Sequence, residues 1–319
     1  FGYYALKNNT ANNNSAFGYK ALRTNTIGVN NVAIGFQALL SNTSGIRNNA
    51  LGVNALLSNT TGNNNNAFGY YALRNNTIGT ANSAFGHQSL QGNTTGVNNS
   101  AFGFQSLIYN TVGKYNSAFG YRSLFNNIAG SNNSAFGYLA LKNNTTNNNS
   151  AFGYRALFNN TTGTYNVAVG TSALTSNTIG LKNSAVGFGA LFNNTIGSNN
   201  SAFGYNSLNN NTTGIQNTAI GSNALMLNTI GINNTAVGYQ SLRANTTGVN
   251  NVAVGSNSLV NNTVGQDNTS VGRSALQNST IGNCNSAFGA YTMQNNTTGG
   301  ANNAFGRFAL KNNTSGYNN

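Results

Sequence analysis

The feature that most constrains the fold of this chain is a 17-residue repeat that runs from its first residue to its last. An apolar residue followed by Gly marks each copy, and nineteen copies follow one another without a linker or a change in composition. A strict period in this range is typical of a solenoid, in which each copy forms one coil and buries apolar side chains against the next coil. We number the apolar residue of each copy as position 0. These residues are Phe1, Phe17, Ile34, Leu51, Phe68, Phe85, Phe102, Phe119, Phe136, Phe152, Val169, Val186, Phe203, Ile220, Val237, Val254, Val271, Phe288 and Phe305.

The repeat predicts one continuous β-solenoid array over residues 1–319, with about 17 residues per coil and no globular domain. The copies that begin at Phe1 and Phe136 are one residue short, and each lacks the Gly that the other copies have at position +11. The sequence starts within one copy and stops within another, at Asn319. We therefore expect both natural ends of the protein to lie outside this sequence.

The residues around position 0 predict a short strand, as in the segment Ser117-Ala118-Phe119-Gly120. We expect position 0 to point inward and to stack on its equivalent one coil away, with the Leu at position +5 as a second apolar row. Because side chains alternate along a strand, the Ala at position −1 is then expected to face outward. The Gly at position +1 predicts a backbone conformation closed to other residues, or a close approach of another backbone.

An outward row of Ala beside a row of Gly predicts a flat surface that packs on another copy of the chain, around a threefold axis or in a fibre. An alternative is that the Ala residues at positions −1 and +4 both fill the narrow core of a single chain. The predicted packing rows include Ala16, Ala33, Ala118, Gly18, Gly35 and Gly120.

Two further rows consist of Asn, at positions +8 and +14. The Asn-Thr-Thr-Gly segment at position +8 predicts a turn beside a second short strand, and the Asn rows are expected to tolerate left-handed backbone and to form amide ladders along the stack. We assign both rows a structural role. Neighbouring coils are expected to lie about 4.8 Å apart, which gives nineteen coils a length on the order of 90 Å.

The composition provides few side chains that could act in catalysis or bind a metal. Fourteen Lys and Arg residues stand against one acid, Asp267, and the formal net charge is +13. With one acid, one His (His87) and one Cys (Cys284), the chain offers no carboxylate pair, nucleophile–base pair or metal cluster, so we expect no enzyme, cofactor or metal. The bases occupy different repeat positions, which predicts no specific nucleic-acid groove. No apolar run reaches membrane-spanning length.

The repeat also generates many Asn-x-Ser/Thr sequons. In a source that glycosylates secreted proteins, they would place glycans at regular turns. The candidate glycosylation sites are Asn8, Asn42, Asn59, Asn75, Asn93, Asn98, Asn143, Asn193 and Asn295.

The unit Asn-[Ser/Thr]-Ala-[Phe/Val/Ile]-Gly-x-x-[Ala/Ser]-Leu, as at residues 116–124, resembles the head repeat of YadA-type trimeric autotransporter adhesins. Related repeats occur in tail-fibre-like proteins. The resemblance covers the whole chain and rests on about six positions per copy. It implies a left-handed parallel β-roll, packing of three chains side by side, and adhesion. The copies here are longer than the usual head repeat, and the apolar-Gly-x-x-[Ala/Ser] core also resembles the left-handed β-helix hexapeptide, which keeps a three-sided coil open as an alternative.

From these patterns we expect a non-enzymatic structural protein, the shaft or body of an extracellular fibre or surface appendage, located outside the cell or on a cell or virion surface and associating with itself as a trimer or bundle. The second expectation is an adhesin or phage-type tail-fibre head that binds cell-surface or glycan receptors. A third is ice binding, through the Thr row at position +9. A local departure from the repeat would favour binding, and the sequence concentrates departures at Asp267, Arg273, Cys284 and Met293.

Overall fold

The computed structural model describes residues 1–319 as an all-β chain with eighteen strands of three residues each. Each strand covers positions −2 to 0 of a copy. The first copy begins at position 0 and forms no strand, so nineteen copies give eighteen strands. They are β1 (Ser15–Phe17), β2 (Val32–Ile34), β3 (Asn49–Leu51), β4 (Asn66–Phe68), β5 (Ser83–Phe85), β6 (Ser100–Phe102), β7 (Ser117–Phe119), β8 (Ser134–Phe136), β9 (Ser150–Phe152), β10 (Val167–Val169), β11 (Ser184–Val186), β12 (Ser201–Phe203), β13 (Thr218–Ile220), β14 (Thr235–Val237), β15 (Val252–Val254), β16 (Thr269–Val271), β17 (Ser286–Phe288) and β18 (Asn303–Phe305).

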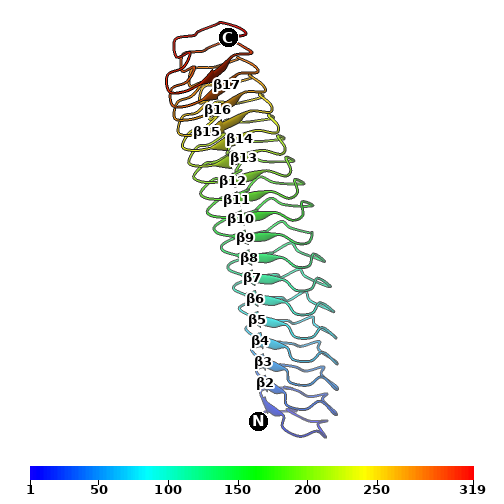
Figure 1. Ribbon diagram of the computed structural model, residues 1–319. Helices are drawn as coiled ribbons and strands as arrows, with labels where there is room; N and C mark the ends of the chain where they lie inside the picture. Colours follow the sequence, from blue (N-terminus) through cyan, green and yellow to red (C-terminus); the bar gives the residue numbers. More distant parts are fainter. The chain divides into compact units, whose positions relative to one another are not determined.

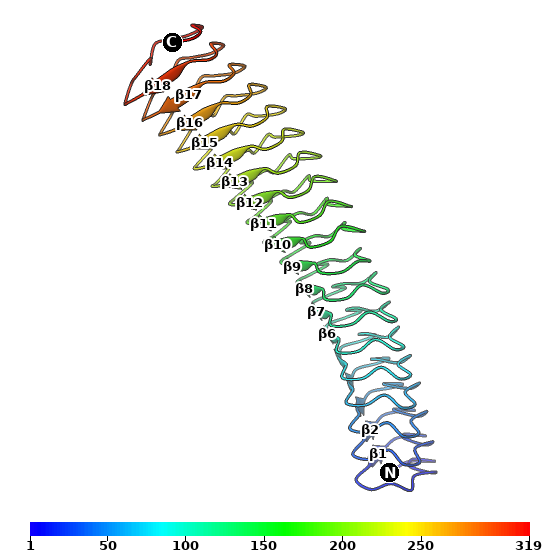
Figure 2. The same cartoon turned by 45° about the vertical axis from the view of Figure 1, so that its right-hand side comes forward.

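The chain divides into two units, Phe1–Thr162 with strands β1 to β9 and Gly163–Asn319 with strands β10 to β18. Within each unit, every strand pairs in parallel with the next strand along the chain, and equivalent positions face each other. Ala16 thus lies opposite Ala33 in the first unit, and Ala168 opposite Ala185 in the second. Figures 1 and 2 show the strands of each unit stacked in sequence order with loops on both sides.

This arrangement confirms the predicted fold class, a parallel β-solenoid with about 17 residues per coil. The prediction of one uninterrupted array over residues 1–319 stays a prediction. The structure contains no helix long and apolar enough to span a membrane.

The predicted orientation of the strands is wrong. Ala33 and Ala118 at position −1 are fully buried, and Ala16 is 9% exposed. The residue at position 0 instead faces outward, with Phe17 57% and Ile34 40% exposed. The Ala residues at positions −1 and +4 fill the interior together with the Leu at +5, which was the alternative considered for the Ala rows. The interior of a typical coil thus holds two Ala or Ser residues and one Leu, while the residue at position 0, often a Phe, lies outside.

Ser270 shows how closely positions −1 and +4 approach inside the core. It replaces the usual Ala at −1, and its hydroxyl is fully buried. The Ser258 hydroxyl, at position +4 of the preceding copy, donates to the Ser270 hydroxyl oxygen at 2.7 Å, and that hydroxyl in turn donates to the Ala275 carbonyl at 2.9 Å. Because a buried polar group needs a hydrogen-bond partner, the two Ser residues compensate each other.

Both explanations predicted for the Gly row at position +1 apply: the backbone conformation disfavours other residues, and another backbone lies close. Gly35 and Gly120 have φ angles of 132° and 130°, a region that side chains disfavour. A Cβ atom built on Gly35 would also lie 2.5 Å from the carbonyl oxygen of Gly52 in the next coil. The Gly row therefore sets the close spacing of coils within the chain, and does not require a partner molecule.

Left-handed backbone occurs where the sequence did not predict it. The residues at positions +3, +5 and +13 have φ near +50° to +60°, as Gln105, Leu107 and Tyr115 do, whereas the Asn rows at +8 and +14 do not. Such a conformation costs roughly 1–2 kcal/mol for a residue with a side chain. Burial of the fully enclosed Leu, about 1.5–3 kcal/mol, offsets this cost at +5. The second strand predicted near position +8 is absent; the segment forms bends whose backbone still bonds the next coil, as Thr43 N does to Thr60 O at 2.9 Å.

The predicted Asn ladders are present and fully buried. At position +14, the Asn48 amide nitrogen donates to the side-chain oxygen of Asn31 at 3.2 Å and to the Gly62 carbonyl at 2.8 Å. At position +8, Asn59 donates to the same Gly62 carbonyl at 3.0 Å. The Gly at +11 therefore joins the two ladders here, and Gly45 does the same one coil earlier, accepting from Asn31 and Asn42. In the short copy that starts at Phe136, the Thr146 carbonyl takes this role, accepting from Asn144 at 2.8 Å.

Candidate functional site

Aromatic rings form two columns on the outer face of the first unit. The position 0 column stacks six Phe rings, with successive centroids 4.6–5.0 Å apart and planes within 8° of parallel. It contains Phe68, Phe85, Phe102, Phe119, Phe136 and Phe152. Each ring covers the faces of its neighbours, so the column offers ring edges to solvent.

The second column is at position +2 and runs through the same coils, with centroids 5.0–5.4 Å apart. Its members are Tyr70, His87, Phe104, Tyr121, Tyr138 and Tyr154. His87 is thus a stacked member of this column. Positions −2, 0 and +2 carry no Lys, Arg, Asp or Glu in the first unit. Charges do reach the position +2 rings from position +3, since Lys20 lies 4.8 Å from the Tyr19 ring centroid and Arg122 lies 5.2 Å from that of Tyr121.

Most basic side chains of the first unit lie at positions +3 and +6, beside the position +2 column. The Arg122 guanidinium, at position +3, lies 5.1 Å from the ring centroid of Phe125 at +6, and Arg155 lies 4.6 Å from the ring of Phe158. Positions +3 and +6 therefore share one face, although they are separate in the repeat. The bases at these two positions are Lys7, Lys20, Arg23, Arg74, Arg122, Lys142 and Arg155.

Adjacent Tyr residues on this surface affect each other's acidity. The ring centroids of Tyr70 and Tyr71 are 3.9 Å apart. The hydrogen bond between their hydroxyls raises the pKa of Tyr70 and lowers the pKa of Tyr71. A donor hydroxyl holds its proton more tightly, while the acceptor is stabilised as a phenolate.

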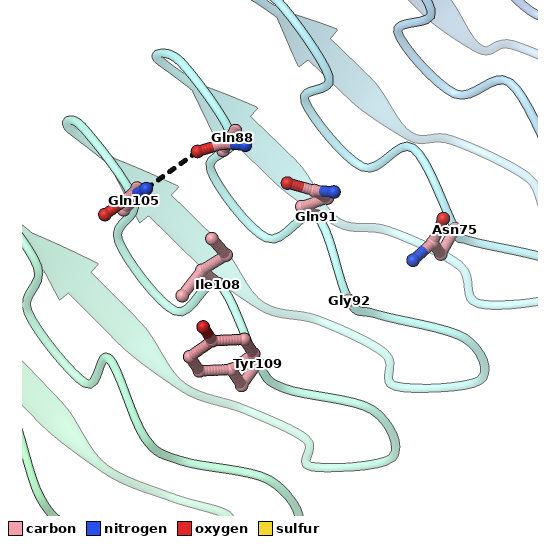
Figure 3. A pocket seen from close by; sticks show the side chains of 7 residues that line it. All are labelled: Asn75, Gln88, Gln91, Gly92, Gln105, Ile108 and Tyr109. Carbon is pink, nitrogen blue, oxygen red and sulfur yellow. Dashed lines mark hydrogen bonds between the residues drawn. The ribbon is translucent and has the colours of Figure 1, made fainter.

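A pocket of about 310 Å³ opens on the face formed by positions +3, +6 and +7. It spans three consecutive copies of the first unit, and Figure 3 shows its lining. Four side-chain amides, one Gly and two apolar groups form the walls: Asn75, Gln88, Gln91, Gly92, Gln105, Ile108 and Tyr109. No charged side chain lines it.

The pocket exists because Gly92 and Tyr109 depart from the repeat at position +7, where Asn or Ser is usual. Gly92 has no side chain to fill the space between Asn75 and Tyr109 (Figure 3). It also lets the coils come closer, because its amide nitrogen lies 2.7 Å from the Ile108 carbonyl, against 3.1 Å for the equivalent Asn75–Gln91 pair. A Cβ atom at Gly92 would lie only 2.7 Å from that Ile108 oxygen.

Hydrogen bonds hold the side chains of Gln88 and Gln105 in the pocket wall, whereas the side-chain oxygen of Gln91 has no partner. Gln105 Nε2 donates to Gln88 Oε1 at 2.7 Å, and Arg122 Nε donates to Gln105 Oε1 at 2.7 Å. These bonds fix the amides of Gln88 and Gln105. Gln91 Oε1, by contrast, is buried and accepts no hydrogen bond.

The structure separates the predicted glycosylation sites into two groups. Asn42, Asn59 and Asn93 lie at position +8, are fully buried, and donate through Nδ2 to a neighbouring Asn and a Gly carbonyl. A glycan on Nδ2 would remove one of the two hydrogens that these ladder bonds use and would need space in the interior, so glycosylation at these three residues stays a prediction that requires the ladder to open locally. The other six sites are exposed or half-buried and stay predictions: Asn8, Asn75, Asn98, Asn143, Asn193 and Asn295.

The departures that the sequence concentrates near residue 280 do not line the pocket. Asp267 is exposed and accepts a 2.9 Å hydrogen bond from Asn250, and Cys284 is an exposed free thiol. Arg273 lies over the ring of Tyr291, and Met293 fills a buried Leu position. No group of three or more His, Cys, Asp or Glu side chains comes together in the chain. The repeat did not predict the pocket, although Gly92 and Tyr109 are visible departures at one repeat position.

No protein-family model matches this sequence, and no curated protein matches it with significance. The fold places the chain in the class of parallel β-solenoids.

Proposed function

We propose that this chain is a structural protein that forms the shaft or body of an extracellular fibre or surface appendage. The proposal rests on the way in which the buried Asn side chains of this chain form their hydrogen bonds. Asn side chains at two positions of nearly every copy bond only to neighbouring coils and to Gly carbonyls. The interior of each coil is therefore specialised for holding the next coil.

Outer Thr residues extend the same pattern. The hydroxyl of Thr60, at position +9, donates to the Thr77 carbonyl in the next coil at 3.1 Å, and Thr77 repeats the bond to Thr94 at 3.1 Å. Strand pairing, Asn ladders and Thr bonds all act along the stack, and a protein built by adding coils grows in length without changing its cross-section. This is the property required of a shaft.

Self-association of the chain, as a trimer or a bundle, is part of this proposal, but the surface differs from the one the sequence suggested. The Ala row is buried, so the face with the two aromatic columns is the better candidate. Its ring edges expose apolar area, and Phe152 remains 39% and Tyr154 48% exposed. Burial of such area against a second chain is favourable at roughly 25 cal/mol per Å². The resemblance to YadA-type head repeats, in which three chains pack side by side, agrees with this arrangement.

Electron microscopy of the native material tests the structural role. Continuous filaments with a uniform cross-section are the expected result. Short heads carried on separate stalks would contradict it and would favour the second candidate, an adhesin or tail-fibre head. The pocket at Gly92 favours that second candidate, because a departure from the repeat at one place is characteristic of a binding site.

Ice binding remains the third candidate because of the Thr row. The Thr43 hydroxyl donates to the Thr60 carbonyl at 3.1 Å. This hydroxyl hydrogen is therefore used within the chain and is not offered to ice, which makes this function the weakest of the three. Thermal hysteresis measured on the purified protein tests this function. An absence of hysteresis would remove it.

A further inference from the structure

We propose that the pocket bounded by Gln91, Gly92 and Tyr109 binds a neutral sugar residue, such as a hexose or an N-acetylhexosamine at the end of a glycan. The pocket is independent of the structural role above, since it rests on two departures from the repeat, Gly92 and Tyr109, and on the side chains beside them. A shaft that carries it gains one specific contact point on an otherwise uniform surface.

The size of the pocket suits a single sugar ring. Its volume of about 310 Å³ falls at the lower end of the range for small-molecule sites, about 300–1,000 Å³. It is formed by the omission of one side chain, at Gly92, between coils whose backbones are fixed by hydrogen bonds on both sides. The cavity is therefore preformed, and a ligand needs little rearrangement of the coils to enter.

The polar lining matches hydroxyl groups. A side-chain amide offers both donors and an acceptor, and a sugar hydroxyl can serve as either partner. Gln91 Oε1 has no hydrogen-bond partner and is covered from solvent, so rotation of this side-chain amide must turn it towards the ligand. A buried acceptor with no donor costs free energy that a ligand hydroxyl or acetamido N–H would recover. Gln88 and Gln105 are held in place beside it by their own hydrogen bond.

The apolar wall matches the C–H face of a sugar ring. Tyr109 is 50% exposed, and its ring meets Phe125 edge-on at 5.0 Å with an interplanar angle of 84°. It is therefore not sandwiched between parallel rings, unlike the members of the two columns, whose faces are covered. Ile108 lines the pocket beside it. An amide-rich pocket with one aromatic wall and no charged group favours a neutral sugar over an acidic one.

Calorimetric titration of the 319-residue chain with methyl glycosides of glucose, galactose, mannose and N-acetylglucosamine tests the proposal. We expect at least one of these probes to bind. Two variants should weaken that binding by at least about tenfold. Tyr109→Asn removes the aromatic wall, and Gln91→Leu removes the unpaired amide. Both place a residue that other copies carry at the same position, such as Asn75 or Leu57, so the fold should tolerate them.

The matched control is Tyr115→Asn. Tyr115 is 56% exposed in the same copy as Tyr109, lies outside the pocket, and is also replaced by the residue usual at its position. This variant should bind as the unmodified chain does. Sialic acid is titrated as the acidic probe. The proposal is overturned if no neutral glycoside binds up to its solubility limit, if only sialic acid binds, or if both pocket variants bind as well as the control.

Discussion

The side-chain nitrogen of Asn59 donates a 2.9 Å hydrogen bond to the side-chain oxygen of Asn42 in the preceding coil, and both side chains are fully buried. The Asn59 oxygen in turn accepts from Asn76 at 2.8 Å. Each amide in this row is thus a donor to one coil and an acceptor from the other. Because the row lies in the interior, no water can replace a missing member.

Replacing Asn59 with Ala should therefore lower the free energy of unfolding by about 2–6 kcal/mol, since two buried groups lose a partner at about 1–3 kcal/mol each. Chemical denaturation followed by circular dichroism measures the effect. The control is Asn75→Ala in the next copy, at an exposed position with little expected effect. Equal destabilisation by the two variants would contradict the role of the ladder.

The ladder has one natural defect, at Ser279, which replaces the Asn of position +8. Ser279 Oγ and the oxygen of Asn262, one coil earlier, are both buried without a hydrogen-bond partner. The change Ser279→Asn should supply the missing donor and raise the free energy of unfolding by about 1–3 kcal/mol. Thermal and chemical denaturation should both report the gain. A neutral or destabilising result would mean that the coils around Ser279 have adjusted to the smaller side chain.

The corrected strand orientation can be tested on two neighbouring residues. Ala33 is fully buried, whereas Ile34 is 40% exposed. The change Ala33→Leu should destabilise the chain by about 1–3 kcal/mol or more, because the core has no room for three additional carbon atoms. The change Ile34→Leu should stay within about 0.5 kcal/mol. If Ala33 faced outward as the sequence suggested, denaturation would show no penalty for the first variant.

That error shows what the repeat can and cannot specify. Strict recurrence correctly predicted the solenoid, the Gly row with its close backbone approach, and the Asn ladders, because each follows from equivalent residues facing one another in register. Alternation along the strand separated Ala33 from Ile34 but did not say which one is inside. Hydrophobicity favoured Ile34 as the inward residue. The narrow core instead accommodates Ala33, and Ile34 faces outward.

Other features depend on backbone geometry that the amino-acid sequence does not reveal. Leu is uncommon in left-handed backbone, so nothing indicated that Leu107 has a φ of 52°. The shared face of positions +3 and +6, and the pocket it carries, arise from how the loop folds between strands. Gly92 and Tyr109 were visible as departures, yet only the folded coils bring Gln88 and Gln105 of position +3 into the same pocket (Figure 3).

The adjacent hydroxyls of Tyr70 and Tyr71 predict a change in acidity. Their hydrogen bond raises the pKa of Tyr70, and Tyr71→Phe removes the partner hydroxyl, so the pKa of Tyr70 should fall towards its ordinary value. A pH titration by NMR with labelled Tyr rings measures this. The pair Tyr3 and Tyr4 has the same arrangement, so Tyr4→Phe should lower the pKa of Tyr3. An unchanged pKa of Tyr70 would show that the hydroxyls do not interact.

The two groups of sequons predict a pattern of modification in a host that glycosylates secreted proteins. Attachment is expected at position +7, as at Asn75 and Asn143, and not at position +8, as at Asn59 and Asn93. The side-chain nitrogen at +8 is buried and donates two hydrogen bonds, to an Asn oxygen and to a Gly carbonyl. A glycan there would remove a donor from the ladder and force a bulky group into the core, so molecules that carry it should fail to fold and be lost during secretion.

Peptide mass spectrometry of the secreted protein measures occupancy at each site. Asn8, Asn98, Asn193 and Asn295 should behave as Asn75 and Asn143 do, because their side chains are exposed or half-buried. A glycan at Asn75 would also stand at the mouth of the pocket, so enzymatic removal of that glycan should increase binding of the neutral glycosides. Occupancy at Asn59 or Asn93 in folded, secreted protein would contradict the buried position of the ladder.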